Sequence, residues 1–176
     1  QLANKSNTPL LFIHNTTGFM VGKKHEQNGM INAGSQLVHA VAGSTVPHIS
    51  LQVGNSYGAG NYAMCGRSFN PRFLFSYPNS KSGVMGADQL AGVMEIVKRK
   101  SAESLNKDID EKLLLEEKRN LAEQAEKKAS VWHTTSEVWD DGVIDPRDTR
   151  KYLSMALSAV YNNTIKGTDS FGVFRM

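Results

Sequence analysis

The sequence predicts an α/β fold with a largely parallel sheet, and three observations support this prediction. A short β-rich run followed by a small-residue turn and a helical pattern occurs twice between Leu10 and Gly66. Strands and helices alternate along this part of the chain, which is typical of parallel sheets because parallel neighbours need a crossover connection. The composition, 176 residues with 40% hydrophobic and 21% charged side chains, suffices for one domain with a substantial core.

The first half of the chain contains two strands, each leading into a helix. Residues 10–14 form a short apolar run that leads to a helical pattern over 26–43, with apolar residues spaced by three and four. Residues 46–53 form the next strand, which Gly54 closes, and a short helix is expected over 60–66. Both strands alternate apolar side chains, so at least one of their faces is expected to meet helices. The side chains expected to be buried are those of Leu11, Ile13, Ile49, Leu51 and Val53.

The second half contains two further strands and a larger share of charged helix. Strands are expected over 72–76 and 81–85, followed by a helix over 87–97. The charge-rich stretch 101–129 is interpreted as a solvated outer helix that is broken once. Asp145 is placed to cap a final helix, because its carboxylate can accept N–H groups of the first turn. Three acid–base pairs in the charged stretch have the favourable spacing of four: Glu103–Lys107, Asp108–Lys112 and Glu123–Lys127.

The turn after the second strand, Gly58-Ala59-Gly60, is the most informative segment for function. A strand that breaks into such a turn and opens a helix leaves backbone N–H groups without partners at the edge of the sheet. No side chain larger than a methyl group stands in the way, so a ligand oxygen can approach these donors closely. This arrangement is suited to stabilising an oxyanion with backbone groups alone. The alternative is a close contact between helix and strand that needs small residues.

The same region contains a competing signal for a serine hydrolase. Gly54-Asn55-Ser56-Tyr57-Gly58 matches the Gly-x-Ser-x-Gly pattern of a nucleophile elbow. The pattern lacks an acid and a histidine in the expected downstream order, apart from His133. Cys65 has no neighbouring base in the sequence and is interpreted as buried filler rather than as a nucleophile.

Charge, histidine and cysteine usage argue against several function classes. The net charge of +3 is mild and the basic residues do not cluster with aromatics, so no nucleic-acid partner is expected. The five histidines are scattered without metal-ligand spacing, so no metal site is expected. A single cysteine excludes an internal disulfide framework. No apolar run approaches membrane-spanning length, so no membrane partner is expected.

Several longer motifs, which together span nearly the whole chain in order, resemble a known family. The motifs are FIHNTTGFMVG (12–22), SYGAGNYAMCGR (56–67), PRFLF (71–75), VMGADQ (84–89), WDDGVIDPRDTR (139–150) and FGVFRM (171–176). They resemble the signature of carboxyltransferase β subunits of biotin-dependent acyl-CoA carboxylases, in particular the methylcrotonoyl-CoA and geranyl-CoA carboxylase branch. The chain departs from that branch at Asp88, where glutamate is common, and over residues 98–138.

The resemblance implies a crotonase-like spiral of ββα units, in which residues 1–176 form most of a C-terminal acyl-CoA carboxyltransferase domain and the N-terminal domain is absent. It implies transfer of a carboxyl group from carboxybiotin, carried on a partner subunit or domain, to a coenzyme A thioester such as 3-methylcrotonoyl-CoA. It also implies a biotin carboxylase and biotin carrier partner, and a homo-oligomer of carboxyltransferase subunits. A bacterial protein of this kind is cytoplasmic, and a eukaryotic one lies in the mitochondrial matrix.

The resemblance also assigns roles to individual positions. The backbone N–H groups of Ala59 and Gly60 match the catalytic donors that hold the ureido oxygen of biotin. In such a site the cofactor supplies the base, while the protein supplies backbone donors. The other matched positions line the biotin site or the acyl pocket: Thr17, Gly18, Phe19 and Gly58 for biotin, and Tyr62 for the substrate.

Three alternatives stay open. The acyl group is geranyl or another acyl chain; or the chain has a different crotonase-fold activity, such as hydration or isomerisation; or it is a non-catalytic crotonase-fold fragment that only assembles with a partner. The second alternative needs an acidic pair near the two oxyanion loops, for which Glu26 is a poor candidate.

Overall fold

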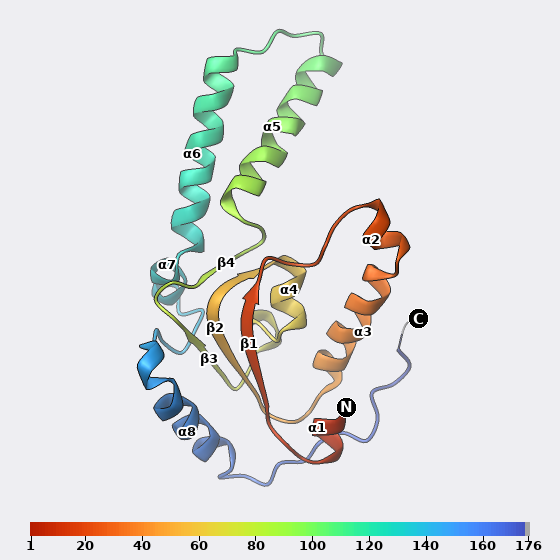
Figure 1. Ribbon diagram of the computed structural model, residues 1–176, viewed down its shortest axis with the longest axis vertical. Helices are drawn as coiled ribbons and strands as arrows, with labels where there is room; N and C mark the ends of the chain where they lie inside the picture. The colour runs from red at the N-terminus through yellow and green to blue at the C-terminus, as the bar shows by residue number, and fades with distance from the viewer. Residues whose placement is uncertain (175–176) are drawn as a thin grey trace.

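The computed structural model describes residues 1–174, and Arg175 and Met176, which end the last motif, lie outside the described residues. Figure 1 shows a small α/β body from which two long helices project. The elements are, in order, α1 (Leu2–Lys5), β1 (Leu10–Thr16), α2 (Lys23–Gln27), α3 (Met30–Gly43), β2 (His48–Tyr57), α4 (Gly58–Ala63), the 3-10 helix η1 (Arg67–Phe69), β3 (Phe73–Ser76), β4 (Lys81–Gly83), α5 (Ala87–Ser104), α6 (Glu111–Ala129), α7 (Val131–Ser136), the 3-10 helix η2 (Pro146–Asp148) and α8 (Thr149–Val160).

The sheet of the described residues has four strands, and β2 lies at its centre. β1 and β3 pair with opposite edges of β2, so that Leu11 lies opposite Ile49 and Ile49 opposite Phe73. β4 pairs with the last residues of β2, where Ser56 lies opposite Ser82. All three pairings are parallel, which confirms the predicted sheet type. The carboxyl ends of the strands therefore meet at one edge, where α4 begins.

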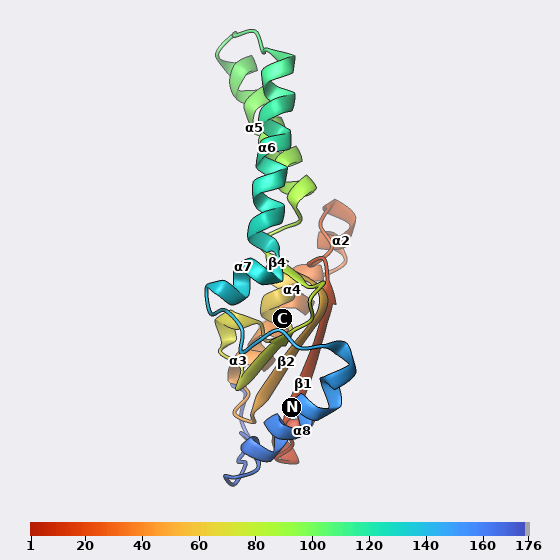
Figure 2. The same ribbon diagram turned by 90° about the vertical axis from the view of Figure 1, so that its left-hand side faces the viewer.

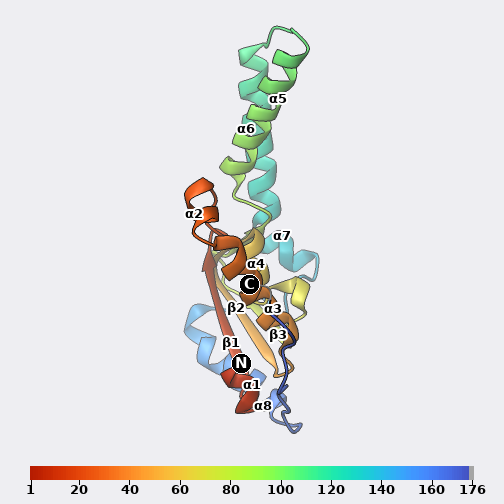
Figure 3. The same cartoon turned by 90° about the vertical axis from the view of Figure 1, so that its right-hand side faces the viewer.

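Helices cover both faces of β2, as Figures 2 and 3 show. On one face α8 packs against Ile49 and Leu51, which together with Phe75 of β3 form the main apolar core. Ile49 and Leu51 are only 1% and 2% exposed, as predicted. On the other face, which α3 and α4 cover, buried polar side chains such as His48 and Ser50 bond to the segments around these helices.

β1 buries the opposite face from the one predicted. Leu11 and Ile13 are 43% and 53% exposed, whereas His14 is fully buried. β1 is an edge strand of the described sheet, and a cavity of about 290 Å³ lies between Leu11 and α8. The prediction that Leu11 and Ile13 are buried is therefore wrong, because no helix of the described residues packs closely on that side of β1. Val53 is partly buried.

β2 runs further than predicted, to Tyr57. Gly54 does not close the strand, and the register between β1 and β2 shifts nearby, between His14 and Thr16. More residues of β2 than of β1 lie within this shift, which is the arrangement of a β-bulge. A Cβ atom on Gly54 would lie 2.5 Å from Asn15 Oδ1, so a side chain there would displace that of Asn15. The glycine therefore marks a bulge rather than a strand end.

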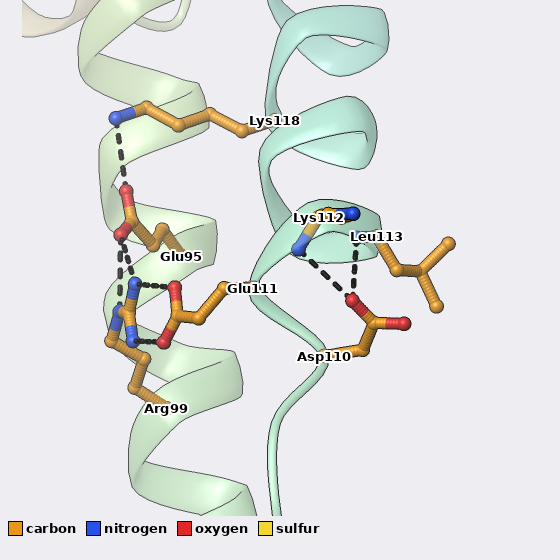
Figure 4. Close-up of polar contacts among 7 residues, drawn as sticks. All are labelled: Glu95, Arg99, Asp110, Glu111, Lys112, Leu113 and Lys118. Atoms are coloured by element: carbon orange, nitrogen blue, oxygen red, sulfur yellow. Dashed lines mark hydrogen bonds and ion pairs between the residues drawn. The ribbon is translucent and has the colours of Figure 1, made fainter.

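The charge-rich stretch forms the end of α5 and all of α6, and its single break falls between Leu105 and Asp110. We call residues 87–129, which form α5, this break and α6, the helical arm. Asp110 caps α6 by accepting hydrogen bonds from the N–H groups of Lys112 and Leu113 (Figure 4). Within residues 1–174, neither these helices nor any other is long and apolar enough to cross a membrane.

Ion pairs connect the two helices of the arm, and one pair within α5, Glu95–Arg99, has the spacing of four. Glu95 of α5 bonds to Arg99 and to Lys118 of α6, and Arg99 reaches Glu111 through two hydrogen bonds of 2.7 and 2.8 Å (Figure 4). These side chains are well hydrated, so the pairs contribute little to stability. Among the described residues, ion pairs are not formed by the predicted partners Glu103–Lys107, Asp108–Lys112 and Glu123–Lys127.

Candidate functional site

α4 begins directly after β2 and presents its first turn at the carboxyl edge of the sheet. Tyr57 is the N-cap residue, and no side chain caps the helix. The N–H groups of Ala59 and Gly60 lie in the first turn, where a helix offers no acceptor of its own. Ala59 is exposed, whereas Gly60 is buried. The expected helix start is therefore present, with its first residue at Gly58.

Gly60 lies directly against the loop that follows β1. A Cβ atom at Gly60 would be 3.0 Å from Thr16 Cγ2 and Oγ1 and 3.1 Å from Gly18 Cα. Gly18 has a φ of +118°, and its N–H donates to Thr16 Oγ1 at 3.2 Å. The small residues of this turn therefore do allow a close contact between the helix and the end of β1, which was the alternative explanation for them. It also brings together the two segments to which the resemblance assigns the biotin site.

The backbone conformation at position 58 favours glycine. Its φ is +54°, in the left-handed region that side chains disfavour. A Cβ atom there would also lie 2.8 Å from the carbonyl oxygen of Val84, which precedes α5. The turn from β2 into α4 is therefore packed backbone to backbone against the segment that leads to the helical arm.

Two of the predicted site residues direct their side chains elsewhere. The Phe19 ring packs on α3, where a Cβ atom at Gly34 would lie 2.3 Å from Phe19 Cε2. Tyr62 is 49% exposed, and its ring meets Phe69 edge-on with centroids 5.8 Å apart. The predicted residues that the structure does bring together are Thr17, Gly18, Gly58, Ala59 and Gly60.

A cavity of about 710 Å³ adjoins this group at Thr17. It lies between Tyr57, at the carboxyl edge of the sheet, and the base of the helical arm, where Asp88 and Glu123 line it. Residues 59–60 do not line the cavity. The cavity therefore lies beside the first turn of α4 rather than over it.

Ser56, the serine of the elbow pattern, is fully buried and has two polar neighbours. Its Oγ lies 2.8 Å from His14 Nδ1 and accepts a hydrogen bond of 2.8 Å from Asn61 Nδ2. The expectation concerned a histidine downstream of Ser56, whereas the histidine that the structure places beside it, His14, lies upstream in β1. The pair still lacks what a nucleophile needs: Ser56 is closed to solvent within β2, and no carboxylate bonds to His14 in the described residues. The geometry therefore does not support the hydrolase alternative.

Burial lowers the pKa of His14 from 6.5 to about 4, and the nearby Met64 carbonyl opposes this shift only in part. An unfolded chain therefore binds a proton at His14 more readily than the folded chain does. The stabilisation is complete above pH 6.5 and is lost as pH falls towards 4. Burial also lowers the pKa of His48, which acts in the same direction.

We therefore expect the free energy of unfolding to fall by about 2 to 3 kcal/mol between pH 7 and pH 4.5 through His14 alone. Urea unfolding at both pH values measures this change, with a His14→Asn variant as the comparison. The variant should lose that much less stability on acidification than the original chain does. Equal losses in the two proteins would contradict the prediction.

Cys65 is fully buried, as predicted, although it follows α4 rather than lying within it. The expectation that it has no basic neighbour is wrong, because His48 Nδ1 lies 3.2 Å from its Sγ. Burial raises the pKa of the Cys65 thiol to about 11 and lowers the pKa of His48. Both groups are therefore neutral near pH 7, and the interpretation of Cys65 as buried filler is confirmed.

Similarity to known proteins extends along the whole chain. A family model described as the carboxyl transferase domain matches residues 1–174. The chain belongs to this family. A probable biotin-dependent acyl-coenzyme A carboxylase beta2 subunit of Mycobacterium tuberculosis is 54% identical over 176 residues, which is 100% of this chain and 33% of that protein. A mitochondrial methylcrotonoyl-CoA carboxylase beta chain of Dictyostelium discoideum is 43% identical over 177 residues, covering 100% of this chain and 30% of that protein.

A solved structure of the carboxyl transferase family has the same fold. The beta subunit of P. aeruginosa geranyl-CoA carboxylase superposes with a TM-score of 0.82 at 44% identity, over 98% of this chain and 32% of that one. The predicted crotonase-like fold class is thereby confirmed. The chain spans about a third of the length of the curated relatives it matches.

Proposed function

We propose that the chain is part of a carboxyltransferase subunit that moves a carboxyl group from carboxybiotin to a branched enoyl-CoA such as 3-methylcrotonoyl-CoA. The observation that carries this proposal is the packing of the first turn of α4 against residues 16–18. This packing sets backbone donors in a segment without large side chains. Membership of the carboxyl transferase family and the names of the relatives support the reaction class.

The residues around this turn suit a neutral, oxygen-bearing group. Residues 16–18 and 58–60 carry no ionisable side chain, and Ala59 is the exposed member of the turn. Biotin, when bound in its carboxylated form, supplies the carboxyl group and the base. The N–H groups of Ala59 and Gly60 would donate to its ureido oxygen and stabilise negative charge there. Because these donors are fixed by the fold, they need no reorganisation as the charge develops.

The acyl group is the finer part of the proposal. The name of the Dictyostelium relative favours 3-methylcrotonoyl-CoA, and that of the P. aeruginosa structure favours geranyl-CoA. We place the acyl chain near Tyr62, whose ring is exposed on α4 within one turn of the donors. Substrates with other acyl chains are the alternatives that the experiment below compares.

We further propose that these residues form most of the C-terminal domain of a homo-oligomeric subunit, which works with a partner that carries biotin. Apolar side chains exposed on β1 and α5, among them Leu11, Ile13, Ile96 and Val97, are surfaces that such an assembly would cover. The assembly would act in the cytoplasm of a bacterium or in the mitochondrial matrix of a eukaryote. The mitochondrial names of eukaryotic relatives support the second location.

The test uses the full-length subunit that contains this chain and a carrier protein bearing carboxybiotin with a labelled carboxyl group. Transfer of the label to 3-methylcrotonoyl-CoA, geranyl-CoA and propionyl-CoA is measured in parallel. We expect the highest kcat/KM with 3-methylcrotonoyl-CoA. A preference for geranyl-CoA would reassign the substrate, and transfer to none of the three would favour the non-catalytic fragment.

A further inference from the structure

A chain of buried polar groups runs beneath the first turn of α4. Asn61 Nδ2 donates to Ser56 Oγ, and Ser56 Oγ lies against His14 Nδ1, each at 2.8 Å. Ser56 and His14 are fully buried, and Asn61 is partly buried. The three residues belong to α4, β2 and β1, so the chain of hydrogen bonds crosses the sheet where its central strand turns into α4.

The donors and acceptors available determine the direction of these hydrogen bonds. Ser56 Oγ already accepts from Asn61, so its own proton needs another acceptor. His14 Nδ1 is the acceptor that the described residues provide, which places the ring proton of the neutral imidazole on Nε2. Nε2 itself has no partner within hydrogen-bond geometry in the described residues. The fixed part of the network therefore runs from Asn61 through Ser56 to Nδ1 of His14.

The network connects the two segments that form the candidate site. His14 lies two residues before Thr16, and Asn61 directly follows Gly60, whose backbone lies against Thr16. The contact between these segments is made by a glycine and short side chains, which limit how closely the segments can approach but, within the described residues, form no hydrogen bond between them. A buried hydrogen-bonded network supplies rigidity, since breaking one link leaves a polar group without a partner.

We propose that His14, Ser56 and Asn61 are positioning residues that hold the first turn of α4 in register with the loop after β1. As far as catalysis is concerned, this inference rests on the proposed carboxyltransferase function. The proposed role requires no contact between these three residues and the reacting atoms. Each acts through the placement of the backbone donors, which must be accurate because a small displacement costs much of their effect.

The test compares Ser56→Ala with Ser50→Ala in the full-length subunit. Both serines are fully buried in β2, and each makes hydrogen bonds to the α4 region, Ser50 through a 2.6 Å bond to the Cys65 carbonyl. We expect Ser56→Ala to lower kcat for carboxyl transfer to 3-methylcrotonoyl-CoA about tenfold, with KM changed by less than about twofold. Ser50→Ala should leave kcat unchanged. Equal kcat values in the two variants would overturn the inference.

A second variant tests whether the residues act as one unit. In Asn61→Ala the same link is lost from its other side, so the Ser56→Ala/Asn61→Ala double variant should be no slower than the slower single variant. If the double variant lowered kcat by the product of the two single reductions, the residues would have independent roles, which would contradict the network.

A measurement that needs no activity separates this inference from the proposed function. Amide hydrogen exchange of the peptide spanning residues 57–64 should be about tenfold faster in Ser56→Ala than in Ser50→Ala. If the original subunit transfers no carboxyl group, the proposed function fails while faster exchange still supports the positioning role. Equal exchange in the two variants would overturn the positioning role, whether or not the subunit is active.

Discussion

Replacing Gly60 with valine should lower carboxyl transfer from carboxybiotin about 30-fold to 1,000-fold, or by about 2 to 4 kcal/mol of transition-state stabilisation. The first added atom would already lie 3.0 Å from Thr16 Oγ1 and 3.1 Å from Gly18 Cα. The backbone of Gly18 cannot yield as a flexible side chain would, so the first turn of α4 must move away from the loop. This displacement carries the N–H groups of Ala59 and Gly60 out of position.

The measurement is transfer of a labelled carboxyl group by the full-length subunit, together with a thermal unfolding curve. Gly92→Ala is the matched control, because Gly92 lies within α5 and a Cβ atom there meets nothing within 4 Å. The control should keep full activity and gain up to about 1 kcal/mol of stability from its better helix propensity. If the Gly60 variant is folded and transfers at the original rate, the donors lie elsewhere.

Replacing Gly58 with alanine should destabilise the fold by about 3 to 5 kcal/mol. The positive φ of +54° accounts for about 1 to 2 kcal/mol. The remainder comes from the added Cβ atom, which would lie 2.8 Å from the Val84 carbonyl oxygen. Because that neighbour is backbone, relief requires a shift of the segment before α5.

Gly29→Ala separates the two causes, since Gly29 has a φ of +86° but a Cβ atom there meets nothing within 4 Å. Urea unfolding should show a loss of about 1 to 2 kcal/mol for Gly29→Ala and the larger loss for Gly58→Ala. Equal losses would mean that backbone strain alone accounts for the need for glycine at position 58.

The order of the elements follows from local patterns, and it was predictable for that reason. The run before Gly54 has the apolar alternation of a strand, and the break in the charged stretch falls where Asp110 caps the next helix. The buried face of β1 did not follow from the same reasoning. Alternation places Leu11 and Ile13 on one face, but it does not indicate which face a helix will cover.

The candidate site was predictable where it depends on backbone alone. Small residues after a strand indicate a helix start whose N–H groups have no acceptor within the helix, and Ala59 and Gly60 lie in the first turn of α4. The hydrogen bond between His14 and Ser56 joins residues 42 positions apart, and no spacing in the sequence indicates it. Only the presence of both residues in the family-like motifs gave a signal, and that signal did not specify their contact.

The base of the helical arm forms part of the wall of the neighbouring cavity, so the position of the arm sets the cavity's width. α5 has 18 residues and is therefore about 27 Å long, so a rotation of about 10° at its base moves its tip by about 5 Å. Asp88 and Glu123 line the cavity from that base, and it is also lined by Tyr57, at the end of β2, and by Thr17, in the loop after β1. A displacement of the far end of the arm would therefore change the width of the cavity by a smaller distance, because the cavity lies near the pivot.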